Sequence, residues 1–224
     1  MVDEYTIFII GAGGHAKELD AYIRDLGRLR GRAIHLAGFI DDFKARQPWG
    51  GSEIIGGFDQ LEAILQADPD SQFFYITAVG QNRIRAQFVQ RAKQLEAVNL
   101  SAWTLQHPDS QIGYKVEIGE GTCLAPGTIV TTHVEVGRHC ILNTRASVSH
   151  DCAIGDFVNI NPGAVVCGNV KIGDGCYVGA GATIIDGISI GEWSVIGAGA
   201  VVINDIPPHA TAVGVPAKVI KENR

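Results

Sequence analysis

The feature that most constrains this chain is an aliphatic residue at every sixth position through its second half. The series begins at Ile112, continues without an insertion to Val202, and holds Ile, Leu or Val at all sixteen positions. Six residues are too few for a helical repeat. They fit a short strand and a tight corner, where a glycine, often the next residue, tolerates a positive φ. Three such units close a triangular coil of about 18 residues, and coils stack at about 4.8 Å. The period therefore predicts a parallel β-helix.

Length and composition leave room for a second domain beside this β-helix. The chain has 224 residues, of which 46% are hydrophobic and 19% charged. Its net charge of −6 gives no support for a nucleic-acid partner, which requires a basic face. No apolar run reaches the roughly 18 residues of a membrane span, and the first ten residues carry acidic side chains where a signal peptide is basic. We therefore expect a cytoplasmic protein with no membrane span.

The cysteines favour free thiols. Five Cys are present, with no C-x-x-C pair that would indicate a zinc site or a redox motif. Cys140 and Cys176 occupy equivalent interior positions two coils apart, roughly 10 Å, which is too far for a disulfide. Cys152 occupies the same interior position of the six-residue repeat, one that holds small side chains, on another face. All three are therefore predicted to pack in the core of a protein kept in a reducing compartment.

Residues 1–105 alternate strands with helices, which predicts a parallel sheet with helices on both faces. The strand YTIFII precedes GAGGHA and an amphipathic helix, KELDAYIRDLG, that is expected to end near Gly27. The segments HLAGFIDD and FFYITAVG read as further strands, and FDQLEAILQA and QNRIRAQFVQRAKQLEA as helices. A linker near Gln106 and Pro108 leads into the β-helix.

Gly11, Gly13 and Ala16 fit the G-x-G-x-x-G/A pattern between a strand and a helix. In that pattern the backbone approaches a phosphate at the helix N-terminus. A tight strand-to-helix turn accounts for the same residues equally well. The domain is also small for a complete dinucleotide fold, so a nucleotide carrying a sugar is a more plausible ligand than NAD.

The combination of GAGGHA, FIDD and a β-helix containing LNTRASVSHD and GNVKIG resembles the sugar acetyltransferases of the bacillosamine and perosamine pathways. It is also similar to the sialic acid O-acetyltransferases of the same family, and the resemblance spans essentially the whole chain. It implies a Rossmann-like domain over residues 1–105 that binds a nucleotide-linked amino sugar. A left-handed β-helix then follows over residues 106–224. It further implies a homotrimer with acetyl-CoA between neighbouring subunits.

The resemblance assigns the catalytic residues. The family's general base matches His150, with Asp151 as its acidic partner, although a Glu is common at the second position. An imidazole with a pKa near neutrality can take the proton of an attacking amine. Gly168 lies 18 residues after His150 and therefore one coil above it. The resemblance and this spacing together make the Gly168 N–H the expected donor to the developing oxyanion.

The resemblance also assigns two binding sets. The nucleotide sugar is expected at Gly13, Gly14, His15, Asp41 and Asp42. Asn82 joins this set because it lies just after a strand, at the carboxyl edge where such sheets bind ligands. Acetyl-CoA, a cosubstrate, is expected at Asn159, Gly168, Gly179, Gly197, Pro216 and Lys218. Some relatives carry a second His where this chain has Asn159. Strand-end solvation is an alternative role for the Asp pair, and Lys218 also fits a solvated tail. No metal is expected.

The implied reaction is direct, acetyl-CoA-dependent N-acetylation of a nucleotide-linked 4-amino-4,6-dideoxy sugar. One alternative is O-acetylation of a sugar such as sialic acid. Another, of a different class, is a non-catalytic trimeric scaffold with a nucleotide-binding domain, which would have no need of VSHD and the glycine one coil above. A β-helix carbonic anhydrase is disfavoured because His133, His139 and His150 are not one coil apart, and a nicotinamide enzyme would give the β-helix no role.

Overall fold

The computed structural model describes residues 5–30, 34–96 and 99–222. The acidic residues Asp3 and Glu4, which entered the localisation argument, lie outside these ranges. The chain divides into two compact units, Met1–Pro108 and Asp109–Arg224.

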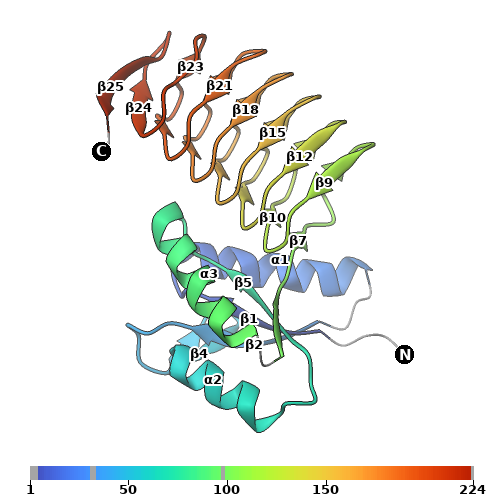
Figure 1. Cartoon of the computed structure of the whole chain (residues 1–224). Coiled ribbons are helices and arrows are strands. Elements are labelled where there is room, and N and C mark those ends of the chain that lie inside the picture. Colours follow the sequence, from blue (N-terminus) through green and yellow to red (C-terminus); the bar gives the residue numbers. More distant parts are fainter. Residues whose placement is uncertain (1–4, 31–33, 97–98, 223–224) are drawn as a thin grey trace. The chain divides into compact units, whose positions relative to one another are not determined.

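The first unit is a Rossmann-like α/β domain built on one sheet with the order β3-β4-β2-β1-β5-β6 (Figure 1). Neighbouring strands run parallel except β3, which is antiparallel to β4. The elements are β1 (Tyr5–Ile10), α1 (Gly14–Arg30), β2 (Ile34–Ile40), β3 (Gln47–Trp49), β4 (Ser52–Gly56), α2 (Phe58–Ala67), β5 (Phe73–Thr77), α3 (Asn82–Glu96), β6 (Leu100–Ala102) and β7 (Leu105–Gln106).

Helices cover both faces of this sheet, as predicted. Phe8 and Ile10 of β1 pack in one cluster with buried residues of α2 and α3. Ile7 and Ile9 alternate with them, are equally buried, and face the opposite side, which α1 covers. Figure 1 accordingly shows α2 and α3 in front of the sheet and α1 behind it.

Two local predictions for this unit are corrected. Helix α1 continues through Gly27 to Arg30, because a glycine inside a helix costs only about 1 kcal/mol and good helix formers follow it. The hairpin of β3 and β4 was not predicted, since Gln47 and Pro48 show no strand pattern. Pro48 is tolerated because β3 is the edge strand of the sheet.

The second unit is a left-handed parallel β-helix with three faces (Figure 1). The first face begins with β7 and continues with β10 (Cys123–Leu124), β13 (Ile141–Leu142), β16 (Asn159–Ile160), β19 (Tyr177–Val178), β22 (Val195–Ile196), β24 (Ala210–Val213) and β25 (Lys218–Glu222). The second contains β8 (Gln111–Ile112), β11 (Ile129–Val130), β14 (Ser147–Val148), β17 (Val165–Val166), β20 (Thr183–Ile184) and β23 (Val201–Val202). The third contains β9 (Val116–Ile118), β12 (Val134–Val136), β15 (Ala153–Ile154), β18 (Lys171–Ile172) and β21 (Ser189–Ile190).

The coil length of 18 residues is confirmed by the strand register. Val130 pairs with Val148, Val148 with Val166, and Val166 with Ile184 along the second face. These aliphatic side chains form a buried interior column of one core cluster. Cys140, Cys152 and Cys176 are buried in the same cluster as free thiols, as the period predicts.

The corners correct the expected role of the glycines. Positive φ occurs three positions after each periodic aliphatic residue from Ile112 to Ile196, whether or not that position is a glycine: Lys115, Gly121, Gly127, His133, His139, Arg145, Asp151, Phe157, Gly163, Asn169, Gly175, Gly181, Gly187, Trp193 and Gly199. The glycine directly after the aliphatic residue is needed for another reason. A Cβ at Gly137 would lie 2.5 Å from the carbonyl carbon of Gly155, so only glycine lets adjacent coils approach.

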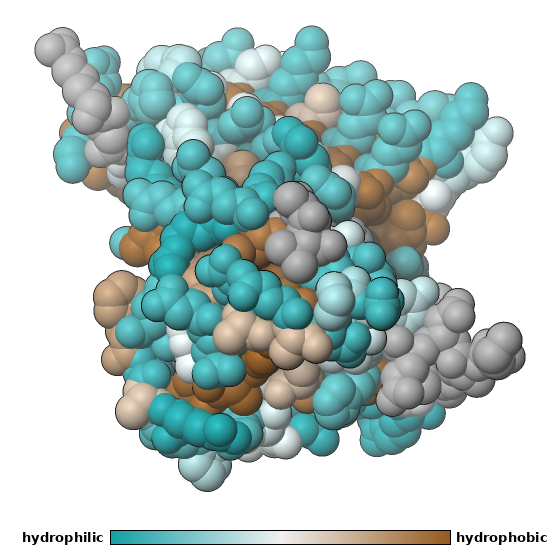
Figure 2. Space-filling view, turned by 60° about the horizontal axis from the view of Figure 1, so that its bottom comes forward, coloured by the Kyte–Doolittle hydropathy of each residue, from teal (hydrophilic) through white to brown (hydrophobic). Residues whose placement is uncertain are grey.

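The β-helix ends in a short antiparallel return, because β25 pairs with β24 in the opposite direction. None of the described helices is both long and apolar enough to cross a membrane. On the face of the protein drawn in Figure 2, hydrophilic side chains surround separate patches of apolar ones.

Candidate active site

The predicted catalytic pair lies at the corner between the second and third faces. His150 and Asp151 follow β14 after one intervening residue, and their side chains are 53% and 55% exposed. Asp151 adopts φ 59°, which turns the chain at the corner, and its N–H donates to the Thr132 carbonyl at 3.2 Å. Nδ1 of His150 lies 2.8 Å from Oδ2 of Asp151. The shorter carboxylate therefore reaches the imidazole.

This pairing fixes what the imidazole can do. An N–H at Nδ1 that donates to the carboxylate leaves Nε2 as the acceptor in neutral His150. The carboxylate also stabilises the imidazolium that forms when Nε2 takes a proton. The exposed corner thus presents a base whose free nitrogen is Nε2.

Gly168 lies directly above His150, as the 18-residue spacing predicts. A Cβ at Gly168 would stand 2.6 Å from Cε1 and 2.8 Å from Nε2 of His150. The absence of a side chain is therefore what leaves room for the imidazole. The Gly168 N–H donates to Oδ1 of Asp186 at 3.1 Å, so the expected oxyanion donor already has an acceptor here.

In the first unit, the glycine-rich turn lies at the carboxyl edge of the parallel strands. Gly11 has φ 102°, and its N–H donates to the Ile40 carbonyl at 2.7 Å. Gly13 and Gly14 are exposed, and a Cβ at either would meet no atom within 4 Å. Because α1 begins at Gly14, its first N–H groups face this open space.

Asp41 and Asp42 both have partners within the domain. Asp41 accepts the N–H groups of Ala12 and Phe43, each at 3.0 Å, and so holds the glycine-rich turn. Asp42 accepts the Phe58 N–H at the start of α2 at 3.0 Å and pairs with Arg91 of α3. These carboxylates therefore do more than face solvent at a strand end.

His15 and Asn82 lie at the same edge. Nδ1 of His15 contacts Oε2 of Glu18 at 2.8 Å, and this hydrogen bond lowers the Glu18 pKa. Nε2 of His15 is buried and has no hydrogen-bond partner among the described residues. Asn82 begins α3 after β5 and is 7% exposed. The ends of β1, β2 and β5 thus bring all six predicted nucleotide-sugar residues to one edge of the sheet.

Comparison with known proteins relates both units to one group of enzymes. Residues 6–92 match the PglD N-terminal domain family, and residues 169–204 match the bacterial transferase hexapeptide (six repeats) family. Curated protein sequences give no match. A variant of GDP-perosamine N-acetyltransferase from Caulobacter crescentus, solved with CoA and GDP-perosamine, is 30% identical with a TM-score of 0.84. The match covers 96% of this chain and 97% of that one.

Two further structures agree. The acetyltransferase domain of PglB from Neisseria gonorrhoeae is 32% identical with a TM-score of 0.81, over 97% of this chain and all of that one. WeeI from Acinetobacter baumannii is 29% identical with a TM-score of 0.84, over 96% and 100% of the two chains. The chain belongs to the hexapeptide-repeat sugar acetyltransferase family. It is therefore an acyltransferase.

The coenzyme residues expected for this acyltransferase do not all lie beside His150. Gly179 and Gly197 occupy the corner between the first and second faces, one coil apart, and each packs tightly against the next coil. Asn159 is a buried residue of β16 on the first face. Of the expected coenzyme set, Gly168 shares the corner of His150. Gly179 and Gly197 mark a different edge of the same β-helix.

The C-terminal pair lies at the end of the β-helix. Pro216 stands in the exposed turn between β24 and β25, and exposed Lys218 begins β25 and pairs with Val213. Its ammonium is accessible to an anionic group. Among residues 5–30, 34–96 and 99–222, no cluster of three or more His, Cys, Asp or Glu side chains could hold a metal ion.

Sequence reasoning missed two lysines of the acyltransferase beside the glycine-rich turn. Nζ of Lys44 donates to the Ala12 carbonyl. Nζ of Lys44 and of Lys17 lie 4.0 and 4.4 Å from the ring centroid of Trp49, as cation–π contacts. Lys17 follows GAGGHA directly, so its position in the first turn of α1 was a usable signal. Trp49 belongs to the hairpin that was not predicted.

Proposed function

We propose that this acyltransferase transfers the acetyl group of acetyl-CoA to the amine of a nucleotide-linked 4-amino-4,6-dideoxy sugar. The observation that carries the proposal is the exposed His150–Asp151 pair, with Nε2 open beside Gly168, in a chain similar along 96% of its length to GDP-perosamine N-acetyltransferase. The crystals of that relative hold CoA and GDP-perosamine, which supports the same two classes of substrate here.

The reaction proceeds by direct transfer with His150 as general base. Nε2 takes a proton from the amine as its nitrogen attacks the thioester carbonyl, which gives a tetrahedral intermediate and an imidazolium held by Asp151. The intermediate collapses to the N-acetyl sugar and releases the CoA thiolate, which takes the proton back from His150. The Gly168 N–H is the expected oxyanion donor, provided that the Asp186 carboxylate gives way.

The neighbouring thiols support a mechanism without an acyl-enzyme. Cys152 is buried, its Sγ donates to the Cys167 carbonyl at 3.0 Å, and burial raises its pKa. Burial likewise raises the pKa of Cys167. Because the thiolate is the nucleophilic form of cysteine, neither residue is suited to accept the acetyl group.

The glycine-rich turn is proposed to bind the diphosphate of the nucleotide sugar. The exposed Gly13 and Gly14 offer backbone N–H groups at the start of α1, and Lys17 and Lys44 add two positive charges nearby. Backbone donors and adjacent cations together are a common way to bind phosphate. Asp41 would then act by holding the turn through the Ala12 N–H.

The active enzyme is proposed to be a cytoplasmic homotrimer. Ile129 and Val165 project from the second face and are 40% and 37% exposed, which supports a subunit contact there. The expected coenzyme residues on another edge than His150 also suit a site shared between copies. All five cysteines are free thiols, which is typical of a reducing compartment.

The deciding experiment measures thiol release from acetyl-CoA with a panel of acceptors. The panel contains UDP-, GDP- and dTDP-linked 4-amino-4,6-dideoxy sugars and free sialic acid. Turnover with one amino sugar is expected and would also identify the nucleotide. Turnover with sialic acid alone would replace the proposal with O-acetylation. No turnover with any acceptor would favour a non-catalytic nucleotide-binding scaffold.

A further inference from the structure

Asp186, which no sequence argument singled out, lies on the same corner as His150. The register that places Gly168 one coil above His150 places Asp186 one coil above Gly168. Asp186 is exposed, and its Oδ1 accepts the Gly168 N–H at 3.1 Å. The imidazole and this carboxylate are therefore separated by a residue that has no side chain.

The geometry at Gly168 shows that the two groups face each other. One point, the position of a Cβ on Gly168, lies 2.8 Å from Nε2 of His150 and 3.1 Å from Oδ1 of Asp186. Nδ1 of His150 is turned toward Asp151, so Nε2 is the nitrogen on the side of Asp186. A group bound at Nε2 would thus lie beside a second carboxylate.

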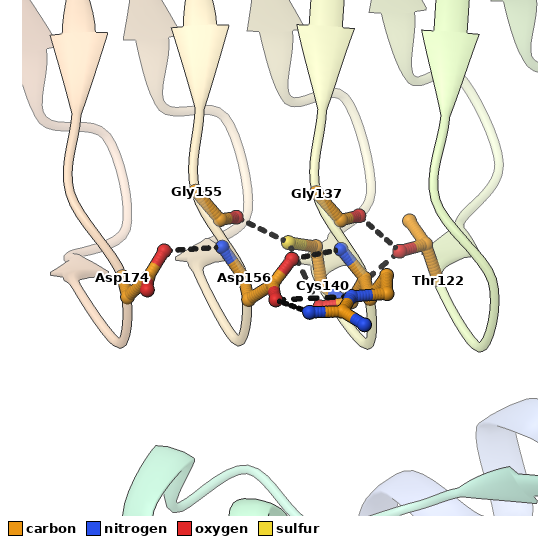
Figure 3. Close-up of polar contacts among 7 residues, drawn as sticks. Thr122, Gly137, Cys140, Gly155, Asp156 and Asp174 are labelled. Atoms are coloured by element: carbon orange, nitrogen blue, oxygen red, sulfur yellow. Dashed lines mark hydrogen bonds and ion pairs between the residues drawn. The ribbon is translucent and has the colours of Figure 1, made fainter.

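Elsewhere in the β-helix, carboxylates also accept hydrogen bonds from the neighbouring coil, but no glycine separates the side chains of successive coils there. Asp156 accepts the Arg138 N–H at 2.7 Å, and Asp174 accepts the Asp156 N–H at 2.8 Å (Figure 3). The Arg138 guanidinium also pairs with the Asp156 carboxylate. That column has a side chain at each of these levels, and each carboxylate accepts the N–H of the level below it. The column of His150 has a gap at its middle level, next to the base.

We propose that Asp186 binds the ammonium form of the acceptor amine beside Nε2 of His150, an inference that rests on the proposed N-acetylation. An alkyl amine is mostly protonated at neutral pH and must lose one proton before it can attack. Asp186 holds the ammonium in place, and Nε2 of His150 accepts one of its protons and passes it to solvent, to which the half-exposed imidazole is open. The neutral amine then attacks the thioester and gives its second proton to Nε2, as in the proposed reaction. The Asp186 carboxylate also stabilises the new imidazolium.

Binding measurements separate this role from a structural one. The Asp186→Asn variant keeps an oxygen that can accept the Gly168 N–H but loses the charge, whereas Asp186→Ala loses both. Calorimetry would compare binding of the amino sugar that turns over in the panel with binding of its N-acetylated product, which has no ammonium. We expect Asp186→Asn and Asp186→Ala to weaken binding of the amine about three- to tenfold and to leave binding of the product nearly unchanged.

Asp174→Asn is the matched control, because it alters the same kind of carboxylate-to-amide contact at another corner. It should change neither affinity. Equal weakening of amine and product in Asp186→Asn, an effect on acetyl-CoA binding alone, or no effect would overturn the inference. If wild-type protein acetylates an amino sugar and Asp186→Asn binds it equally well, this inference alone fails. If wild-type protein neither binds nor acetylates any amino sugar, the proposed function fails and the inference with it.

Discussion

At the scale of single residues, His150 carries the proton transfer on which the proposed reaction depends. Replacing it with Ala removes Nε2 and leaves the β-helix corner in place, because the side chain is half-exposed. We expect kcat to fall by a factor of about 10²–10⁴, the usual contribution of a general base. Acetyl-CoA affinity should change little. Steady-state kinetics and equilibrium coenzyme binding test the two parts separately.

A matched His-to-Ala change controls for nonspecific effects. His35 lies in β2 of the first unit and is exposed. The His35→Ala variant should retain wild-type turnover. A His150→Ala enzyme with nearly full activity would remove the general base from the mechanism and with it the role of Asp151.

Gly168 is predicted to matter through the space that it leaves. In Gly168→Ala, the new methyl group would overlap the His150 ring, 2.6 Å from Cε1, and displace it. A displacement of about 1 Å at a catalytic group can cost about 10²-fold in rate, so a loss of that order is expected. The same change in a His150→Ala background should cost little more. A double-mutant cycle measures this coupling, and additive losses would show that Gly168 acts independently of the imidazole.

Spacing alone predicted which residues share this corner, but not how their side chains meet. The 18-residue coil gave the column of His150 and Gly168, and the same arithmetic leads to Asp186, which was overlooked because only one coil was considered. The contact of Nδ1 with Asp151 depends on the left-handed φ of Asp151. The residue type at that position does not predict such a φ, since this corner holds Lys115, His133 and Asn169 as well as Gly187 at the same place.

At the scale of elements, the strands and interior of the β-helix followed from the six-residue period, because an inward aliphatic side chain must recur with the coil. The corners did not follow, since close approach of coils and positive φ both favour glycine but at different positions. In the first unit, the hairpin of β3 and β4 was missed because it is short and lies at the edge of the sheet. Its Trp49 and the neighbouring lysines consequently escaped prediction.

The thiol interior of the β-helix predicts a specific loss of stability in alkali. Burial raises the pKa of Cys176 from 9.0 to about 11. Between these values the unfolded chain releases the thiol proton and the folded protein keeps it, so the free energy of unfolding falls as the pH rises. Near pH 10 this contribution is about 1 kcal/mol.

A comparison of variants isolates the contribution of Cys176. The free energy of unfolding, measured with urea, should fall less steeply between pH 8 and pH 10 for the Cys176→Ala variant than for the wild type. Val178→Ala, which alters a fully buried residue of the same coil that does not titrate, should follow the wild-type slope. Parallel curves for all three proteins would show that the Cys176 thiol does not titrate differently in the folded state.

At the scale of the whole molecule, the expected catalytic and coenzyme residues lie on two different edges of the β-helix. His150 and Gly168 lie between the second and third faces, whereas Gly179 and Gly197 lie between the first and second. In the proposed trimer, a coenzyme that lies between two copies would contact one edge on one chain and the other edge on its neighbour. The half-exposed aliphatic side chains of the second face, Ile129 and Val165, provide a surface on which such copies could pack.

The proposed homotrimer should have a native mass of three times the 23.8 kDa of one chain, measurable by light scattering after size exclusion. Val165→Glu places a charge on the second face and should dissociate the trimer, because an unpaired charge buried in a contact is costly. Leu29→Glu, the same kind of change at a 54% exposed residue of α1, should leave the mass unchanged. If the coenzyme lies between copies, dissociated Val165→Glu protein should also lose acetyltransferase activity while its circular dichroism stays native. A folded monomer with full activity would show that one chain contains the complete site.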